Sequence, residues 1–165
     1  MKIALLGYGK MGQEIERLVE KRDHEIVLVL DSIEDWEKEG HRLNEADVAI
    51  EFSMPQYVVD NIYHCFNARI PVVVGTTGWL ENLEEIKEIC AEQNQSLFYA
   101  SNYSIGVNLF FDLNRFLARA MSKYQEYEIS IEETHHIHKQ DAPSGTAITI
   151  ANDIIRNISI RNGIV

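Results

Sequence analysis

Residues 3–12 read IALLGYGKMG, a short apolar run that leads directly into three glycines with the spacing G-x-G-x-x-G. Beyond the first glycines, apolar residues recur at i, i+4, i+7 and i+8, which predicts a helix with one apolar face. These residues are Met11, Ile15, Leu18 and Val19. The chain is therefore expected to begin with a buried strand, a glycine turn and an amphipathic helix.

The same alternation continues to about residue 100. Further apolar runs lie at 26–30, 48–52, 72–74 and 97–100, and helix-like stretches separate them. Continuous apolar runs of this kind are typical of strands that are buried on both faces of a parallel sheet. We therefore predict an α/β fold, with a doubly wound, Rossmann-like domain over residues 1–102. In such sheets ligands bind at the carboxyl ends of the strands.

The pattern changes near residues 102–105. Residues 107–121 predict one helix, with its apolar face formed by Leu109, Leu113, Phe116, Leu117 and Ala120. Residues 127–133 (YEISIEE) alternate between apolar and polar side chains, which predicts a half-exposed strand. We expect a second, α+β domain over residues 103–165.

Composition narrows the class of function. The net charge is −11 and the isoelectric point is about 4.9, with no basic stripe, so we expect neither a nucleic-acid partner nor an anionic membrane surface. The first apolar run is too short for a signal peptide, and no run reaches the length of a membrane span. Cys65 and Cys90 lie in helix-like stretches beside other apolar residues and are expected to be buried free thiols. These features favour a cytoplasmic protein.

The glycine turn has the chemistry of a dinucleotide site. The first glycine allows the tight turn, the second lets the backbone approach a pyrophosphate, and the third lets helix and strand pack closely. Asp31 follows Gly12 by nineteen residues, at the end of the second apolar run, where a carboxylate accepts a hydrogen bond from a ribose 2′-hydroxyl. NADH is favoured over NADPH because no arginine adjoins Asp31, although Lys10 could assist a phosphate. A purely structural glycine turn is the alternative.

A second small-residue turn, GTTG at 75–78, follows another predicted strand. A nicotinamide ribose would pass this end of the sheet, and the two threonine hydroxyls could bind it. The alternative is a turn without a ligand.

Residues 131–147 read IEETHHIHKQDAPSGTA. His135, His136 and His138 could bind a metal, but neighbouring residues on an extended strand point to opposite faces, and Lys139 would repel a cation. We therefore expect no metal.

Acid–base chemistry suits the same segment better. Histidine exchanges protons near neutral pH, and a lysine beside it can hold an anion or donate a proton. Ser144 is a predicted N-cap, and the N–H groups of Gly145 and Thr146 would suit a substrate carboxylate. This combination indicates reduction of a small anionic compound with a C=N or C=C bond. A solvated polar loop before a capped helix is the alternative.

The stretch EETHHIHKQDAPSGTA at 132–147 resembles the signature of the 4-hydroxy-tetrahydrodipicolinate reductase family, also called dihydrodipicolinate reductases, of bacterial lysine and diaminopimelate biosynthesis. The segments GYGKMG at 7–12, GTTG at 75–78 and ASNYSIGVN at 100–108 resemble the other motifs of that family, in the same order. The resemblance covers essentially the whole chain. It implies an NAD(P)H-dependent oxidoreductase that converts 4-hydroxy-tetrahydrodipicolinate to tetrahydrodipicolinate.

The resemblance also implies individual roles. His135 matches the catalytic acid, and Lys139 matches a second proton donor that also holds the substrate. His136 and the backbone of Gly145 and Thr146 match the contacts to the substrate carboxylates. The residues that match the contacts to NADH or NADPH are Gly7, Tyr8, Gly9, Lys10, Met11, Gly12, Asp31, Gly75, Thr76, Thr77, Ala100, Ser101, Asn102 and Tyr103.

Members of the family are homotetramers built largely through the second domain, so the resemblance implies a homo-oligomer that binds a small dicarboxylate. They also continue beyond the segment that corresponds to residue 165. We therefore expect residues 103–165 to form an incomplete substrate-binding and oligomerisation domain. The alternatives are another nicotinamide-dependent reductase of a small acid, or a dinucleotide-binding module without catalysis.

Overall fold

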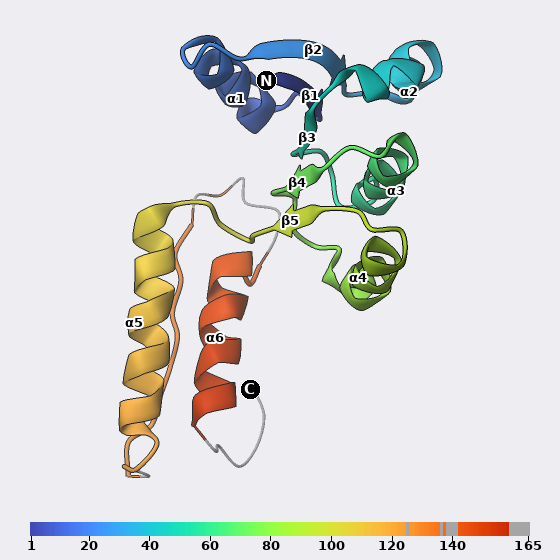
Figure 1. The fold of residues 1–165 in the computed structure, drawn as a ribbon. Coiled ribbons are helices and arrows are strands. Elements are labelled where there is room, and N and C mark those ends of the chain that lie inside the picture. The colour runs from blue at the N-terminus through green and yellow to red at the C-terminus, as the bar shows by residue number, and fades with distance from the viewer. Residues whose placement is uncertain (125, 136, 138–141, 159–165) are drawn as a thin grey trace. The chain divides into compact units, whose positions relative to one another are not determined.

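The computed structural model describes residues 1–124, 126–135, 137 and 142–158 (Figure 1). The chain divides into two compact units, residues 1–100 and residues 101–165.

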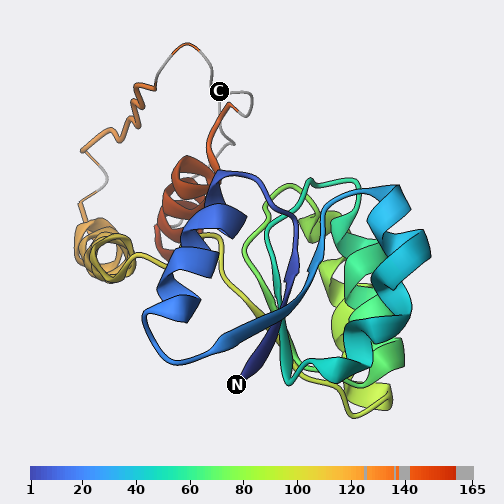
Figure 2. The same ribbon diagram turned by 90° about the horizontal axis from the view of Figure 1, so that it is seen from above.

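The first unit is a parallel sheet of five strands in the order β2-β1-β3-β4-β5. The strands are β1 (Lys2–Leu6), β2 (Glu25–Leu30), β3 (Val48–Glu51), β4 (Val72–Val74) and β5 (Leu97–Tyr99). The helix α1 covers one face, and α2, α3 and α4 cover the other (Figures 1 and 2). These helices are α1 (Lys10–Glu20), α2 (Ile33–Glu39), α3 (Val58–Ala68) and α4 (Leu83–Glu92), with short 3-10 turns η1 (Gly40–Glu45) and η2 (Leu80–Asn82). The predicted doubly wound α/β fold is confirmed.

The core explains why the strands read as solid apolar runs. In β1, Ala4 and Leu6 pack into the layer under α3 and α4, whereas Ile3 and Leu5 pack on the side of α1. Because helices cover both faces of the sheet, residues on both sides of each strand are apolar, and the strands show no alternation of apolar and polar residues.

The predicted apolar face of α1 is only half correct. Val19 is buried and Ile15 packs against the sheet, but Met11 and Leu18 are 50% and 43% exposed. Met11 lies in the first turn of α1, beside the glycine loop.

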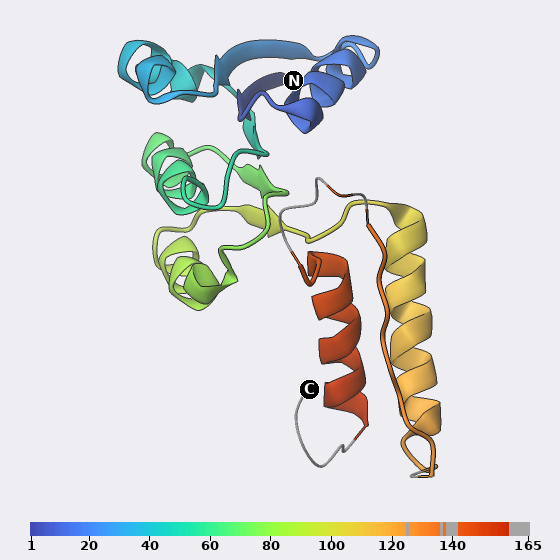
Figure 3. The ribbon, with the colours of Figure 1, turned by 180° about the vertical axis from the view of Figure 1, so that it is seen from behind.

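The second unit contains α5 (Ile105–Met121) and α6 (Gly145–Asn157), which lie side by side and run in the same direction (Figure 3). The Arg115 guanidinium contacts the Asp153 carboxylate at 3.0 Å. The Asn114 side-chain amide donates to the Ile150 carbonyl at 3.2 Å. These two contacts fix the register between the helices.

The predicted helix is confirmed as α5. On its predicted apolar face, Leu109, Leu113, Phe116 and Leu117 are exposed, whereas the buried side chains are Phe111 and Ala118. The expected strand is wrong. Residues 127–133 form no strand, since the described residues of this unit provide no neighbouring strand to accept their hydrogen bonds.

Among the described residues, no helix combines the length and apolar character that crossing a membrane requires.

Both cysteines are free thiols, as predicted, but only Cys65 is buried as expected. Burial, with a smaller contribution from Glu51, raises the pKa of Cys65 to about 12, whereas Cys90 is half-buried. Only the thiolate reacts with alkylating reagents. We therefore expect a brief alkylation at mildly alkaline pH to label Cys90 and to spare Cys65 until the protein unfolds. Peptide mass spectrometry measures this directly, and equal labelling of both thiols in the folded protein would contradict it.

Candidate active site

The glycine loop between β1 and α1 contains three glycines of two kinds. At two of them a side chain would overlap neighbouring atoms, and at the third the surrounding space is open. Gly7 has φ +94°, and a methyl group there would overlap the Phe52 carbonyl. A methyl group at Gly12 would overlap the Gly7 carbonyl. At Gly9, the N-cap of α1, an added methyl group would meet no described atom within 4 Å. The open position therefore lies at the helix N-terminus, where backbone N–H groups can bind an anion.

Asp31 holds this loop in place. Its Oδ1 atom accepts a hydrogen bond from the Tyr8 backbone N–H at 2.6 Å, so the end of β2 is tied to the glycine turn. The sequence predicted that Asp31 binds a ribose hydroxyl. The bond from Tyr8 does not prevent this, because the two oxygens of a carboxylate can accept several hydrogen bonds at once.

Asp35 is a second carboxylate at this end of β2, and sequence reasoning missed it. Its Oδ2 atom accepts from the backbone N–H groups of Asp31 at 3.1 Å and Ser32 at 2.9 Å, and the Ser32 side chain caps α2 in return. Hydrogen bonds from Ser32, followed by that from the Asp31 backbone, lower the pKa of Asp35. The S-x-x-D spacing of a capping box was the signal that could have identified it.

The end of β3 contributes a segment that sequence reasoning also missed. The Phe52 ring occupies the space that a side chain at Gly75 would need, while the Phe52 carbonyl lies against Gly7. Phe52 therefore leaves no space for a side chain at either Gly7 or Gly75, two of the glycines that the sequence assigned to the site.

Glu51 is fully buried at the end of β3. Its Oε1 atom accepts from the Ser53 backbone N–H at 3.0 Å, from the Ser53 hydroxyl and from the Asn61 side chain at 3.3 Å. These bonds fix the turn that follows Phe52. A lone glutamate inside the apolar run VAIEF was the available signal, because buried carboxylates need partners.

The GTTG turn after β4 provides an unsatisfied hydroxyl. Thr76 is only 8% exposed, and its Oγ1 atom has no hydrogen-bond partner within the described part of the chain. Its carbonyl accepts from the Trp79 indole N–H at 2.8 Å, and Gly78 has φ +84°. The buried hydroxyl, the open N-cap at Gly9 and the Asp31 carboxylate fit a dinucleotide with phosphate and ribose groups.

The predicted segment from Ala100 to Tyr103 spans the boundary between the two units. The Ala100 N–H donates to the Val74 carbonyl at 3.4 Å, which places it at the end of β5. In the second unit, the Asn102 side chain accepts from the Ser104 N–H at 2.9 Å, and the Ser101 hydroxyl lies 3.5 Å from that of Thr149.

His135 belongs to a hydrogen-bonded group in the second unit. Its Nε2 atom lies 2.9 Å from Oε2 of Glu133. Glu133 also accepts from the Ser144 N–H at 2.8 Å and from the Ser144 hydroxyl at 2.6 Å. Ser144 is the N-cap of α6, as predicted, and accepts from the Ala147 N–H at 3.0 Å. Glu133 was part of the quoted motif but had no role in the sequence interpretation.

The first turn of α6 contains Gly145 and the next residue, Thr146. The N–H groups in the first turn of a helix have no hydrogen-bond acceptor within the helix, so those of Gly145 and Thr146 can donate to a carboxylate. Lys139 and His136 lie outside the described residues, as does His138. Among the residues that are described, no group of three metal-ligating side chains gathers, and the expectation about metal stays a prediction.

Hydrogen bonds from the Ser144 side chain, then from His135, lower the pKa of Glu133 to about 2. Its ordinary pKa is 4.5, so these bonds stabilise the folded unit fully above that pH and are lost as the pH falls towards 2. At neutral pH Glu133 is therefore an ionised carboxylate.

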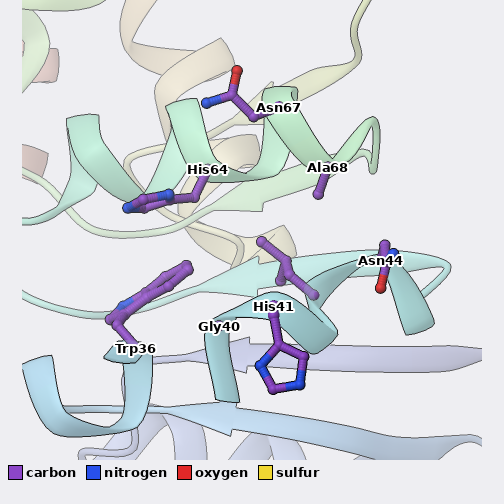
Figure 4. A pocket seen from close by; sticks show the side chains of 8 residues that line it. Trp36, Gly40, His41, Asn44, His64, Asn67 and Ala68 are labelled. Atoms are coloured by element: carbon purple, nitrogen blue, oxygen red, sulfur yellow. The ribbon is translucent and has the colours of Figure 1, made fainter. Parts of the chain in front are cut away.

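A hollow of about 330 Å³ between α2–η1 and α3 lies outside this constellation (Figure 4). The Trp36 ring stacks on His64 there, with ring centroids 4.4 Å apart. None of the predicted site residues lines it.

Comparisons with known proteins agree with the arrangement of motifs. The family profile "Dihydrodipicolinate reductase, N-terminus" matches residues 1–103, and the profile "Dihydrodipicolinate reductase, C-terminus" matches residues 106–163. A 4-hydroxy-tetrahydrodipicolinate reductase from Christiangramia forsetii is 50% identical over 99% of this chain and 67% of its own length. One from Staphylococcus haemolyticus is 36% identical over 96% of this chain and 66% of its own length.

A solved structure, a dipicolinate-bound dihydrodipicolinate reductase from Paenisporosarcina sp. TG-14, superposes with a TM-score of 0.68 at 25% identity. The match covers 99% of this chain and 69% of that one. The chain thus spans about two thirds of the length of its relatives.

Both profiles match in the order that the motifs predicted, and together they cover nearly the whole sequence. The chain therefore belongs to the dihydrodipicolinate reductase family, whose members depend on a nicotinamide cofactor.

Proposed function

We propose that the protein is an NAD(P)H-dependent 4-hydroxy-tetrahydrodipicolinate reductase that forms tetrahydrodipicolinate in lysine and diaminopimelate biosynthesis. Family membership at 50% identity supports this proposal most strongly. In the proposed division of labour, residues 1–102 bind the dinucleotide, and residues 103–165 bind the substrate and contribute to a homo-oligomer.

The proposed chemistry divides into binding and proton transfer. Loss of the 4-hydroxyl group as water leaves a C=C bond conjugated with the ring C=N bond, and the nicotinamide, when bound, would supply a hydride to this unsaturated ring. The open N-cap at Gly9 would receive the pyrophosphate, and the Thr76 hydroxyl would face the nicotinamide half. The N–H groups of Gly145 and Thr146, with His136, would hold the substrate carboxylates. His135, assisted by Lys139, would deliver the proton to carbon.

The decisive experiment measures substrate-dependent oxidation of NADH and NADPH by the full-length protein. Turnover with 4-hydroxy-tetrahydrodipicolinate supports the proposal. Turnover only with another compound in a panel of small unsaturated acids would identify a different reductase, and NADH binding without any turnover would identify a binding module. Light scattering after size-exclusion chromatography tests the homo-oligomer separately.

We further propose that NADH is preferred over NADPH. A 2′-phosphate beside Asp31 would meet that carboxylate and the ionised Asp35 next to it. The Asp31 and Ser32 N–H groups, which could bind a phosphate, already donate to Asp35. Charge repulsion and the engagement of these two donors both disfavour the phosphate.

Asp35→Asn should therefore raise the affinity for NADPH more than the affinity for NADH, and shift the ratio by roughly tenfold, which corresponds to about 1.4 kcal/mol. Titration of each dinucleotide by tryptophan fluorescence measures the ratio. Glu37→Gln removes the same charge from an exposed position of α2 and is the matched control. An unchanged ratio in Asp35→Asn would contradict the electrostatic argument.

A further inference from the structure

Glu133 connects two parts of the substrate machinery that the proposed function treats separately. One carboxylate oxygen lies 2.9 Å from Nε2 of His135 and 2.6 Å from the Ser144 hydroxyl, and the other lies 2.8 Å from the Ser144 backbone nitrogen. His135 is the proposed proton donor, and Ser144 caps the helix whose first turn would bind a substrate carboxylate. A single side chain therefore links the proton donor to the carboxylate site.

The hydrogen bonds also define which atoms carry hydrogen. Glu133 is ionised at neutral pH, since its pKa is lowered to about 2, and an ionised carboxylate can only accept. The contact to Glu133 therefore requires a hydrogen on Nε2 of His135. The Ser144 hydroxyl must likewise donate to Glu133, which leaves its lone pairs for the Ala147 N–H.

We infer that Glu133 is a positioning residue that holds His135 in the tautomer with hydrogen on Nε2, so that Nδ1 is the nitrogen that exchanges a proton with the substrate. This inference rests on the proposed acid role of His135. In the reductive step, the Nδ1–H bond of the imidazolium breaks, and its proton goes to the substrate carbon next to the one that receives hydride from the nicotinamide. The imidazole is left neutral with its Nε2–H bond to Glu133 intact, and solvent returns the proton to Nδ1.

The role assigned to Glu133 differs from a simple structural one. If Glu133 had only a structural role in the loop, removing its charge would lower the free energy of unfolding. Its effect on turnover would then be no larger than that of removing Ser144. As a positioning residue, it controls the histidine tautomer directly, and its loss should act on kcat. Ser144 bonds to Glu133 and caps α6, so its loss should act mainly on KM through the helix N-terminus.

The test compares Glu133→Gln, Ser144→Ala and Glu132→Gln in the full-length protein. Glutamine has one side-chain oxygen in place of two and cannot accept all three bonds. We expect Glu133→Gln to lower kcat by roughly 10–100-fold, by analogy with the loss of the hydrogen-bond partners that orient metal-binding histidines. Ser144→Ala should mainly raise KM, and Glu132→Gln, which removes the neighbouring exposed charge, should behave as wild type.

Long-range proton–nitrogen NMR of histidine side chains reads the tautomer without any catalysis. The His135 signal is assigned by its loss in His135→Gln. In the wild type we expect the Nε2–H tautomer at mildly alkaline pH, and in Glu133→Gln a shift towards the Nδ1–H form. An Nδ1–H tautomer in the wild type, or a Glu133→Gln variant with the kcat of Glu132→Gln, would overturn the inference.

The two readouts separate this inference from the proposed function. Absence of reductase turnover in the wild type would refute the function, while the tautomer measurement would still test the arrangement of Glu133 and His135. If Glu133→Gln fails to fold, as judged by circular dichroism, the wild-type tautomer alone decides.

Discussion

Gly7→Ala should destabilise the protein by roughly 2–5 kcal/mol, because two costs add at this position. The backbone has φ +94°, a conformation that side chains rarely adopt, and a methyl group would overlap the Phe52 carbonyl at the end of β3. Neither cost can be relieved by a rotamer change, because the obstructing atoms belong to the backbone. Urea unfolding followed by circular dichroism measures the loss.

Gly9→Ala is the matched control for that variant. Gly9 lies two residues further along, has φ −71°, and has open space around the position of an added methyl group. Its loss should cost less than about 1 kcal/mol, in line with other N-cap substitutions of glycine. The methyl group should instead obstruct the pyrophosphate and weaken NADH binding. Equal destabilisation by both variants would contradict the assignment of Gly7 to packing and Gly9 to binding.

This pair shows what the glycine motif encodes. The spacing G-x-G-x-x-G predicted the strand, the turn and the helix, and the structure has all three. The sequence could not show that Phe52 fills the space between Gly7 and Gly75, because that contact joins the ends of three different strands. Local patterns report burial and turn conformation, whereas contacts between strand ends depend on the sheet order.

The polar networks were harder to predict for the same reason. Tyr8 and Asp31 meet across adjacent strands, and Glu133 meets Ser144 across a segment rich in histidine. In both cases the residues already belonged to motifs that the sequence shows, but neither motif indicates that these two particular residues are hydrogen-bonded to each other. Glu51 and Asp35 were also missed, although a charge in an apolar run and a capping-box spacing were local signals that would have allowed their identification.

In the second unit, the helical period of α5 was recognised, but the face that packs was not. The periodic residues Leu109 and Leu113 are exposed, while Phe111 and Ala118 pack. Amphipathic periodicity identifies a stripe, and which stripe is buried depends on the neighbouring element. The alternating residues 127–133 carry the pattern of a strand, but a strand needs a hydrogen-bonded neighbour, which the described residues of this unit do not provide.

His135→Gln is expected to lower kcat by about 10²–10⁴-fold, the usual contribution of a general acid. Glutamine keeps a polar group that can bond to Glu133, but it has no proton that it can release near neutral pH. The KM for the substrate should change less than kcat, because the proton moves only in the transition state. The dissociation constant of NADH should not change, since His135 is not among the residues expected to contact the dinucleotide.

Steady-state kinetics and NADH fluorescence titration on the full-length protein separate these quantities. His41→Gln alters an exposed histidine on η1 and controls for the general effect of the substitution. Unchanged kcat in His135→Gln together with a large loss in Lys139→Met would transfer the acid role to Lys139. In that case Glu133 would orient a histidine that binds the substrate without donating the proton. The ratio of kcat losses between the two variants therefore determines which side chain delivers the proton that completes the reduction.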